Sequence, residues 1–194
     1  MPDSGEKELY LTFDDGPVSG PTEFVLETLK RSDAKATFFC IGDNIRKHSA
    51  VFRQVVAEGH AVGNHTFNHL NGWKTDTSHY IENTIQCDRE IKSNLQALKH
   101  PEVSLFRPPY GRITRDQISA LKDLKIIMWD VLSIDYNTGL SGEKCLTNTI
   151  RATRPGSIIV FHDSYKAEKN LTAVLPRFID HFTALGFSFK AITA

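Results

Sequence analysis

The sequence predicts an α/β fold, specifically a distorted (β/α) barrel of seven or eight strands in a single domain. Short apolar segments alternate along the chain with segments whose apolar residues recur at helical spacing. Several of the strand-like segments are apolar at consecutive positions, as parallel strands buried on both faces require. An open, doubly wound sheet is the competing architecture for this alternation.

Seven segments have the pattern of short parallel strands. The first of them stops at Gly16-Pro17, a pair that forces a turn. In chain order the segments are residues 9–13, 36–41, 61–62, 103–106, 126–131, 157–161 and 187–192.

Helices are predicted where apolar residues recur three or four positions apart. No linker, repeat or low-complexity stretch interrupts this order, so we expect one domain over residues 1–194 with its core at about 9–192. The helical groups are Phe24, Val25, Leu26 and Leu29; Ile45, Val51, Phe52, Val55 and Val56; Ile81, Ile85, Ile91, Leu95 and Leu98; and Leu171, Val174, Leu175, Phe178, Ile179 and Phe182.

Composition excludes several classes of protein. Lys and Arg together number 23, as do Asp and Glu, so no basic excess points to nucleic acid or an anionic membrane surface. The longest apolar runs are about four residues, far too short to span a bilayer. The first residues lack the apolar stretch of a signal peptide. Cys40, Cys87 and Cys145 show no CxxC spacing, and we expect buried thiols.

An acidic pair, Asp14 and Asp15, stands where the first strand ends. Side chains of neighbouring strand residues point to opposite faces, so both carboxylates reach one site only if the chain bends there. Gly16-Pro17 supplies such a bend. Alone, the pair could equally be an acidic turn ahead of a helix N-terminus.

Two histidines, His65 and His69, follow the segment 61–62. Histidines four apart fall on one side of a helical turn and can converge on a single cation. An isolated HxxxH pattern more often places two histidines on the surface or in the core. In a barrel, however, all strand C-termini open on one face, so the pair would meet the acidic pair. One Asp and two His leave positions open on a metal, which is the pattern of a catalytic site.

Three further strand ends carry polar residues. Arg107 begins the run Arg-Pro-Pro-Tyr-Gly, in which two prolines predict a rigid, extended loop that fixes the guanidinium and the Tyr110 N–H. Asp135 follows the segment 126–131, and His162 follows 157–161. Each of these residues has a plain structural explanation by itself. Together, the five strand ends provide a metal site, a base, an acid and an orienting cation, the set that metal-assisted hydrolysis needs.

These five motifs, in this order, resemble the polysaccharide deacetylases of carbohydrate esterase family four, the NodB-homology domain. The resemblance covers the chain from about residue 9 to 192. It implies a distorted (β/α) barrel, a divalent ion that is most often zinc, with Co²⁺, Ni²⁺ or Mn²⁺ as alternatives, and an N-acetylated glycan as substrate. The implied reaction removes acetyl groups from N-acetylglucosamine-type residues of a peptidoglycan or chitin-like chain, outside the cytoplasm or in the cell envelope.

The resemblance also implies a role for each matched residue. The implied metal ligands are Asp15, His65 and His69. The implied catalytic groups are Asp14 as general base, Arg107 as its orienting partner, the Tyr110 N–H as oxyanion donor, and His162 as acid paired with Asp135.

Three positions depart from the family pattern. Leu132 and Tyr136 replace an Asp and a Trp in the fourth motif, and Val160 replaces a Leu in the fifth. Such positions line the pocket for the acetyl methyl, so they bear on substrate choice. Two alternatives stay open: an O-acetyl esterase acting on xylan-like chains, and a catalytically inactive carbohydrate-binding homologue.

Two other residues are candidates for supporting roles. Trp73 follows the histidine loop and could stack on a sugar face, since carbohydrate sites favour aromatic platforms. Asp163 lies beside His162 and either supports the site or acts as a helix N-terminal carboxylate.

Overall fold

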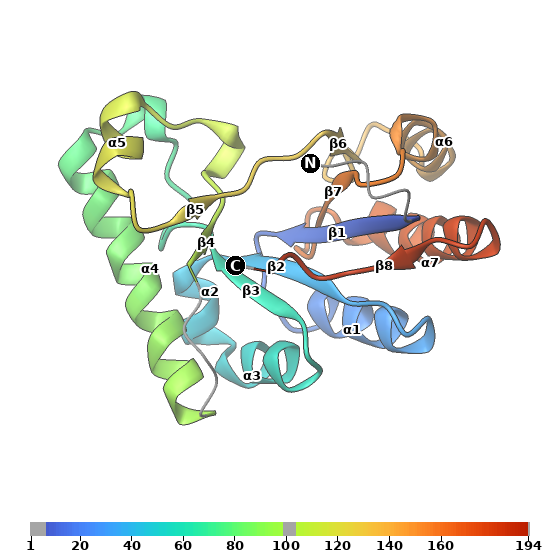
Figure 1. Ribbon diagram of the computed structural model, residues 1–194, viewed down its shortest axis with the longest axis horizontal. Coiled ribbons are helices and arrows are strands. Elements are labelled where there is room, and N and C mark those ends of the chain that lie inside the picture. Colours follow the sequence, from blue (N-terminus) through green and yellow to red (C-terminus); the bar gives the residue numbers. More distant parts are fainter. Residues whose placement is uncertain (1–6, 99–103, 194) are drawn as a thin grey trace.

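Eight strands form one sheet in the computed structural model, which describes residues 7–98 and 104–193 (Figure 1). The spatial order is β5-β4-β3-β2-β1-β7-β6, with β8 also pairing on β1. All of these pairings are parallel. The strands are β1 (Glu8–Asp14), β2 (Ala36–Cys40), β3 (Ala61–Asn64), β4 (Leu105–Phe106), β5 (Lys125–Ile126), β6 (Val131–Leu132), β7 (Ile158–His162) and β8 (Ser188–Phe189).

The strand order identifies the sheet as an incomplete (β/α) barrel. From β1 to β5 the strands follow one another in space as in sequence, without the reversal that marks a doubly wound sheet. On the other side of β1 come β7 and then β6, as a closing barrel requires. The predicted barrel class is therefore confirmed, with a seam between β5 and β6.

The segment 126–131, predicted as one strand, crosses this seam, and that prediction was wrong. β5 ends at Ile126 and pairs with β4, whereas β6 begins at Val131 and pairs with β7 at the opposite edge. The connecting residues run between the two edges (Figure 1). An apolar run cannot reveal such a crossing, because Ile127, Met128 and Trp129 are apolar and look like strand residues.

Two other predicted strands are longer than the observed ones. β4 covers only Leu105–Phe106; its predicted first residue, Val103, lies outside the described residues. β8 covers Ser188–Phe189 instead of residues 187–192. Next to β8, Phe187 packs against the main core and Ile192 lies in a small cluster with Phe39.

Seven α-helices are present in the described part of the chain, and two of them lie outside the helical groups given above from the sequence. α5 is short and buries Gln117, while α6 buries mainly Cys145, Leu146 and Thr149. The helices are α1 (Pro21–Arg31), α2 (Gly42–Lys47), α3 (Ser49–Ala57), α4 (Thr77–Ala97), α5 (Arg115–Ala120), α6 (Gly142–Ala152) and α7 (Glu168–Ala184). None of the helices in the described residues is long and apolar enough to span a bilayer.

Side chains along β1 point alternately into two hydrophobic clusters. Leu9, Leu11 and Phe13 pack in the main core, which includes residues of the surrounding helices α1, α3 and α7. Tyr10 packs in a small inner cluster around Phe39. Because strand side chains alternate with a period of two, Asp14 also points to the barrel interior. The carboxyl ends of the parallel strands thus form the rim of one site.

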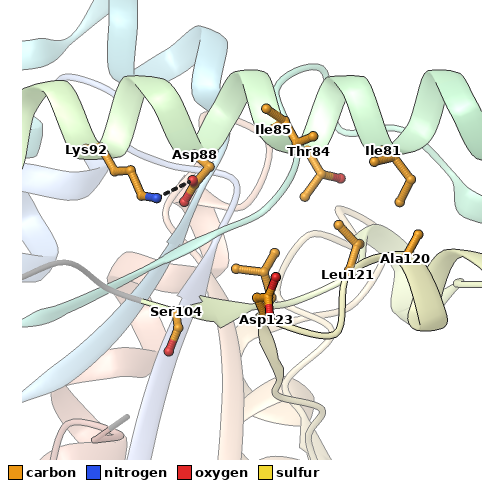
Figure 2. A pocket seen from close by; sticks show the side chains of 10 residues that line it. Ile81, Thr84, Ile85, Asp88, Lys92, Ser104, Ala120, Leu121 and Asp123 are labelled. Atoms are coloured by element: carbon orange, nitrogen blue, oxygen red, sulfur yellow. Dashed lines mark ion pairs between the residues drawn. The ribbon is translucent and has the colours of Figure 1, made fainter.

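A separate cavity of about 410 Å³ opens between α4 and the turn after α5 (Figure 2). Its wall includes Ile81, Leu121 and the ion pair of Asp88 with Lys92. Ser104, another wall residue, precedes β4. This cavity therefore lies toward the amino ends of the strands, away from the rim that carries the predicted site.

Candidate active site

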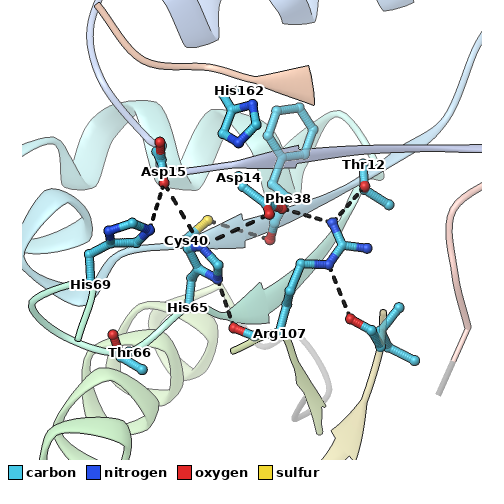
Figure 3. Close-up of polar contacts among 12 residues, drawn as sticks. Thr12, Asp14, Asp15, Phe38, Cys40, His65, Thr66, His69, Arg107 and His162 are labelled. Carbon is cyan, nitrogen blue, oxygen red and sulfur yellow. Dashed lines mark hydrogen bonds and ion pairs between the residues drawn. The ribbon is translucent and has the colours of Figure 1, made fainter. Parts of the chain in front are cut away.

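The predicted site residues converge on one cavity of about 500 Å³ at the carboxyl ends of the strands. Figure 3 shows the acidic pair, the two histidines, Arg107 and His162 gathered there. The cavity is lined by Asp14, Asp15, His65, His69, Tyr110, Arg112, Trp129, Leu132, Tyr136, Val160, His162 and Lys166. The three residues that depart from the family pattern are thus part of the wall.

Asp15, His65 and His69 form a group suited to a divalent metal. Their ligand atoms all lie within 4.8 Å of one another, with His69 Nε2 at 3.2 Å and His65 Nε2 at 3.8 Å from Asp15 Oδ1. Asp15 Oδ1 is buried and has no hydrogen-bond partner among the described residues. A buried acceptor without a donor is costly unless a cation completes it, and two imidazoles with one carboxylate suit zinc.

Both histidines can offer the Nε2 atom of a neutral ring to a metal. His65 Nδ1 lies 2.7 Å from the carbonyl oxygen of Arg107, which can only accept, so Nδ1 carries the proton. For His69, burial and the neighbouring His65 lower the pKa to about 4, although Asp15 opposes this shift. His69 is therefore neutral at neutral pH. His65 therefore presents the lone pair of Nε2 to the metal-binding group, and the neutral His69 ring can do the same.

The histidine loop is not helical, and the predicted helical turn was wrong. β3 ends at Asn64, and the loop turns through positive φ at Thr66 (61°) and His69 (57°). Side-chain amides hold it in shape: Asn64 Oδ1 accepts from the Thr66 N–H, and Asn83 Oδ1 accepts from two further N–H groups of the loop. These bonds replace the helical ones and bring the two rings to 5.0 Å.

The bend after β1 separates the two carboxylates. Asp15 has φ 82°, so its side chain leaves the alternation of the strand. Asp163 accepts hydrogen bonds from the Gly16 N–H at 3.0 Å and from the Thr22 hydroxyl at 2.6 Å. Because α7 begins only at Glu168, Asp163 is no helix N-terminal carboxylate. It supports the turn that carries Asp15, which resolves the two alternatives for this residue.

Asp14 is paired with Arg107 inside the barrel. Arg107 Nη1 donates to Asp14 Oδ1 at 2.8 Å and to Thr12 Oγ1 at 2.7 Å. Burial alone would raise the pKa of the Asp14 carboxyl, but the positive charge of Arg107, helped by His65 and His162, lowers it below the usual value. Asp14 therefore stays ionised and directed into the cavity.

Arg107 itself is fully buried and links β1 to the segment that follows β5. Its Nε and Nη2 donate to the carbonyl oxygens of Ile127 and Met128, and its guanidinium lies 4.1 Å from the centre of the Phe39 ring. These contacts provide hydrogen-bond acceptors for the N–H groups of the buried guanidinium. The residue combines the support of Asp14 with a link from β1 to the segment that follows β5.

His162 and Asp135 form the second polar pair of the site. His162 Nδ1 lies 2.7 Å from Asp135 Oδ1, and the His162 N–H donates to Asp135 Oδ2 at 2.8 Å. Burial alone would lower the pKa of His162, but the hydrogen bond and charge of Asp135 outweigh it and raise the pKa to about 9. Tyr136 packs edge-on against the ring at 4.9 Å. His162 is thus cationic at neutral pH.

The loop after Arg107 forms a tight turn, in contrast to the extended loop that the prolines predicted. Residues Pro109–Gly111 make one turn of 3₁₀ helix, closed by the bond from the Gly111 N–H to the Pro108 carbonyl. Proline cannot donate, yet its carbonyl still accepts, so the turn can close. Tyr110 has φ 61°, and its exposed ring packs on His69 at 4.6 Å.

Trp73 lies outside the cavity wall but beside it. Its side chain is 65% exposed, and its indole N–H donates to the Ile113 carbonyl. The ring also faces the guanidinium of Arg112, which does line the cavity. The proposed stacking of Trp73 on a sugar therefore stays a prediction.

Comparisons with known proteins show which family the chain resembles. A family model described as polysaccharide deacetylase matches residues 2–129. A peptidoglycan-N-acetylglucosamine deacetylase of Bacillus cereus is 34% identical over 159 residues, which are 81% of this chain and 56% of that protein. A chitooligosaccharide deacetylase of a Bradyrhizobium species is 35% identical over 166 residues, covering 84% of this chain and 73% of the relative.

Solved structures agree as well. The Bc1960 peptidoglycan N-acetylglucosamine deacetylase superposes with a TM-score of 0.89 at 29% identity, over 96% of this chain and 86% of the other. The chain spans only about half the length of the Bacillus cereus relative described above. On the strength of the family match and these identities, the chain belongs to the polysaccharide deacetylase family.

Proposed function

We propose that the protein is a metal-dependent hydrolase that removes acetyl groups from N-acetylglucosamine-type residues of a glycan. The single observation that carries this proposal is the position of Asp14. It is ionised by Arg107 and lies 3.9 Å from His65 Nε2, next to the metal-binding group and in the same cavity as His162. The names of the relatives support an N-acetylglucosamine substrate.

The metal would be held by Asp15, His65 and His69, and we propose zinc. When bound, it would supply Lewis-acid polarisation of the acetyl carbonyl and lower the pKa of water in the site. The ligand set of two nitrogens and one carboxylate oxygen supports zinc, while Co²⁺, Ni²⁺ and Mn²⁺ accept the same donors.

The residues of the chain divide the proton transfers between them. Asp14 accepts a proton from the attacking water while the oxygen of that water adds to the acetyl carbon. The Tyr110 N–H donates to the oxygen that becomes negative, a contribution of about 3–4 kcal/mol for one such donor. His162 then gives its Nε2 proton to the amine nitrogen as the C–N bond breaks, because Asp135 holds Nδ1. The products are acetate and a free amino sugar.

The charged neighbours of Asp14 and His162 fit these two roles. Arg107 keeps Asp14 anionic and therefore able to take a proton, whereas Asp135 keeps His162 cationic and able to give one. Opposite pKa shifts on the two groups are the arrangement that an acid–base pair needs.

Because polymeric glycans do not cross membranes, we propose that the reaction takes place outside the cytoplasm or in the cell envelope.

Acetate release tests the proposal. The protein is freed of metal with a chelator, reloaded with each of the four ions, and assayed on a panel of N-acetylated and O-acetylated glycans. We expect release from N-acetylglucosamine polymers only after reloading, together with bound metal near one equivalent. Release from O-acetylated xylan alone would favour an esterase. No release with metal bound would indicate a carbohydrate-binding homologue.

A further inference from the structure

Two basic side chains stand at the rim of the active-site cavity. Arg112 follows the turn after β4, and Lys166 follows the end of β7. In the sheet, β4 and β7 lie on opposite sides of β1, β2 and β3 (Figure 1). The loops after β1 and β3 carry the acidic pair and the two histidines, so the two cations bracket the catalytic groups.

Both cations contact aromatic rings, and neither has an acidic partner in the part of the chain that the structure describes. The guanidinium of Arg112 lies 5.2 Å from the centre of the Trp73 ring, and Lys166 Nζ lies 5.4 Å from that of Tyr136. Neither forms an ion pair with a carboxylate in residues 7–98 or 104–193. Cation–π contacts orient a charged group without neutralising it.

The cavity offers these cations no carboxylate of its own. Among the described residues, its only acidic wall residues are Asp14, which is paired with Arg107, and Asp15, which belongs to the metal-binding group. The chain as a whole has equal numbers of acidic and basic residues. The rim is therefore a local excess of positive charge on a neutral protein, and a cleft with such a rim attracts anions.

We propose that Arg112 and Lys166 bind carboxylates on the sugars that flank the residue being deacetylated, so that the preferred substrate is an acidic glycan strand. This inference rests on the proposed deacetylase function. A guanidinium matches a carboxylate with two parallel hydrogen bonds, while an ammonium acts as a point charge that tolerates several positions. Strands in which N-acetylglucosamine alternates with a sugar that bears a free carboxylate place such groups on both sides of the target.

The test compares three substrates of equal length. One is the alternating strand with free carboxylates, the second is the same strand with its carboxyls converted to methyl esters, and the third is a neutral N-acetylglucosamine oligomer. The measurement is kcat/KM for acetate release by the metal-loaded protein. For wild type we expect the free acid to exceed its ester by roughly two- to fivefold for each cation engaged. Added salt should shrink this ratio, because exposed charges are screened.

Variants assign the preference to the two side chains. Arg112→Gln and Lys166→Gln should each lower the acid-to-ester ratio of kcat/KM, and the double variant should bring it to about one. Arg112→Lys, which keeps the charge, should retain most of the ratio. Lys122→Gln removes an exposed charge near the other cavity and should leave the ratio as in wild type. Thermal melting of each variant checks that it is folded.

The possible results distinguish failure of the carboxylate-binding inference from failure of the deacetylase function. Equal kcat/KM on acid and ester, with clear acetate release from both, would overturn the inference and leave the deacetylase function standing. So would variants that lower kcat/KM by the same factor on all three substrates. No acetate from any of them would overturn the deacetylase function, and the inference with it.

Discussion

Asp14 and Arg107 form an ion pair of 2.8 Å within the barrel, where both side chains are almost completely buried. The same guanidinium donates to Thr12 and to the carbonyl groups of the seam at Ile127 and Met128. Support of the proposed base and attachment of the segment after β5 to β1 therefore depend on one side chain. Its removal should affect stability as well as catalysis.

Arg107→Met should lower the free energy of unfolding by about 3–5 kcal/mol, because it leaves the buried Asp14 without its partner. Urea denaturation measures this loss. The control is Arg154→Met, which breaks the exposed pair with Asp130 and should cost less than about 1 kcal/mol. Similar losses in the two variants would show that the buried pair has no special weight in the fold.

Asp14→Asn should reduce acetate release by roughly 10²- to 10⁴-fold, since the amide cannot take a proton. Metal content, measured by elemental analysis, should stay at the wild-type level. Asp15→Asn is the matched variant one residue away, and it should lose metal as well as activity. Retention of near wild-type turnover by Asp14→Asn would remove Asp14 as the base.

His162 should titrate with a pKa of about 9 in the metal-free protein, as measured by NMR. This value lies above the unfolded value of about 6.5, so the stability that the Asp135 pair supplies is complete below pH 6.5 and is lost as the pH rises through about 9. Asp135→Asn should bring the pKa below 6.5, because burial then acts without the compensating charge. An unchanged pKa in that variant would contradict the pairing.

The catalytic consequence of His162 can be measured separately. His162→Ala should slow hydrolysis of an N-acetyl sugar far more than that of an activated acetyl ester, because only the amine must be protonated to leave. The ratio of kcat values on the two substrates is the readout. An equal loss on both would count against His162 as the acid for the leaving group.

Gly16→Ala should weaken metal binding. A Cβ at this position would lie 2.0 Å from Asp163 Oδ2, so the turn or the buried carboxylate must move, and Asp15 with it. Metal affinity by competition with a chelator measures the effect. Gly139→Ala, whose added methyl meets only Asn137 Oδ1 at 3.3 Å, is the control. An affinity equal to wild type in Gly16→Ala would show that the turn does not position Asp15.

The main features of the site could be predicted because the chemistry lies where strands end. Asp14, His65, Arg107 and His162 each follow an apolar segment, and parallel strands deliver their carboxyl ends to one rim. The role of each residue came from the family resemblance instead. Only the arrangement, and not the role, is a consequence of strand position.

The features that could not be predicted depend on contacts distant in sequence. The helical turn expected for His65 and His69 gives way to a loop because Asn83 binds the loop N–H groups. Asp163 holds Gly16 from the opposite side of the turn, 147 positions away along the chain. The seam after Ile126 looks like a strand because its residues are apolar. Local pattern carries no information about such long-range partners.

The seam has a consequence for how this protein can change over time. In a barrel closed by backbone hydrogen bonds this link would be dispensable, whereas here replacement of Arg107 detaches the segment after β5 from β1. His69 lies nearer the surface and has no such structural duty. A homologue that has lost the reaction but kept the fold should therefore have lost His69 and retained Arg107.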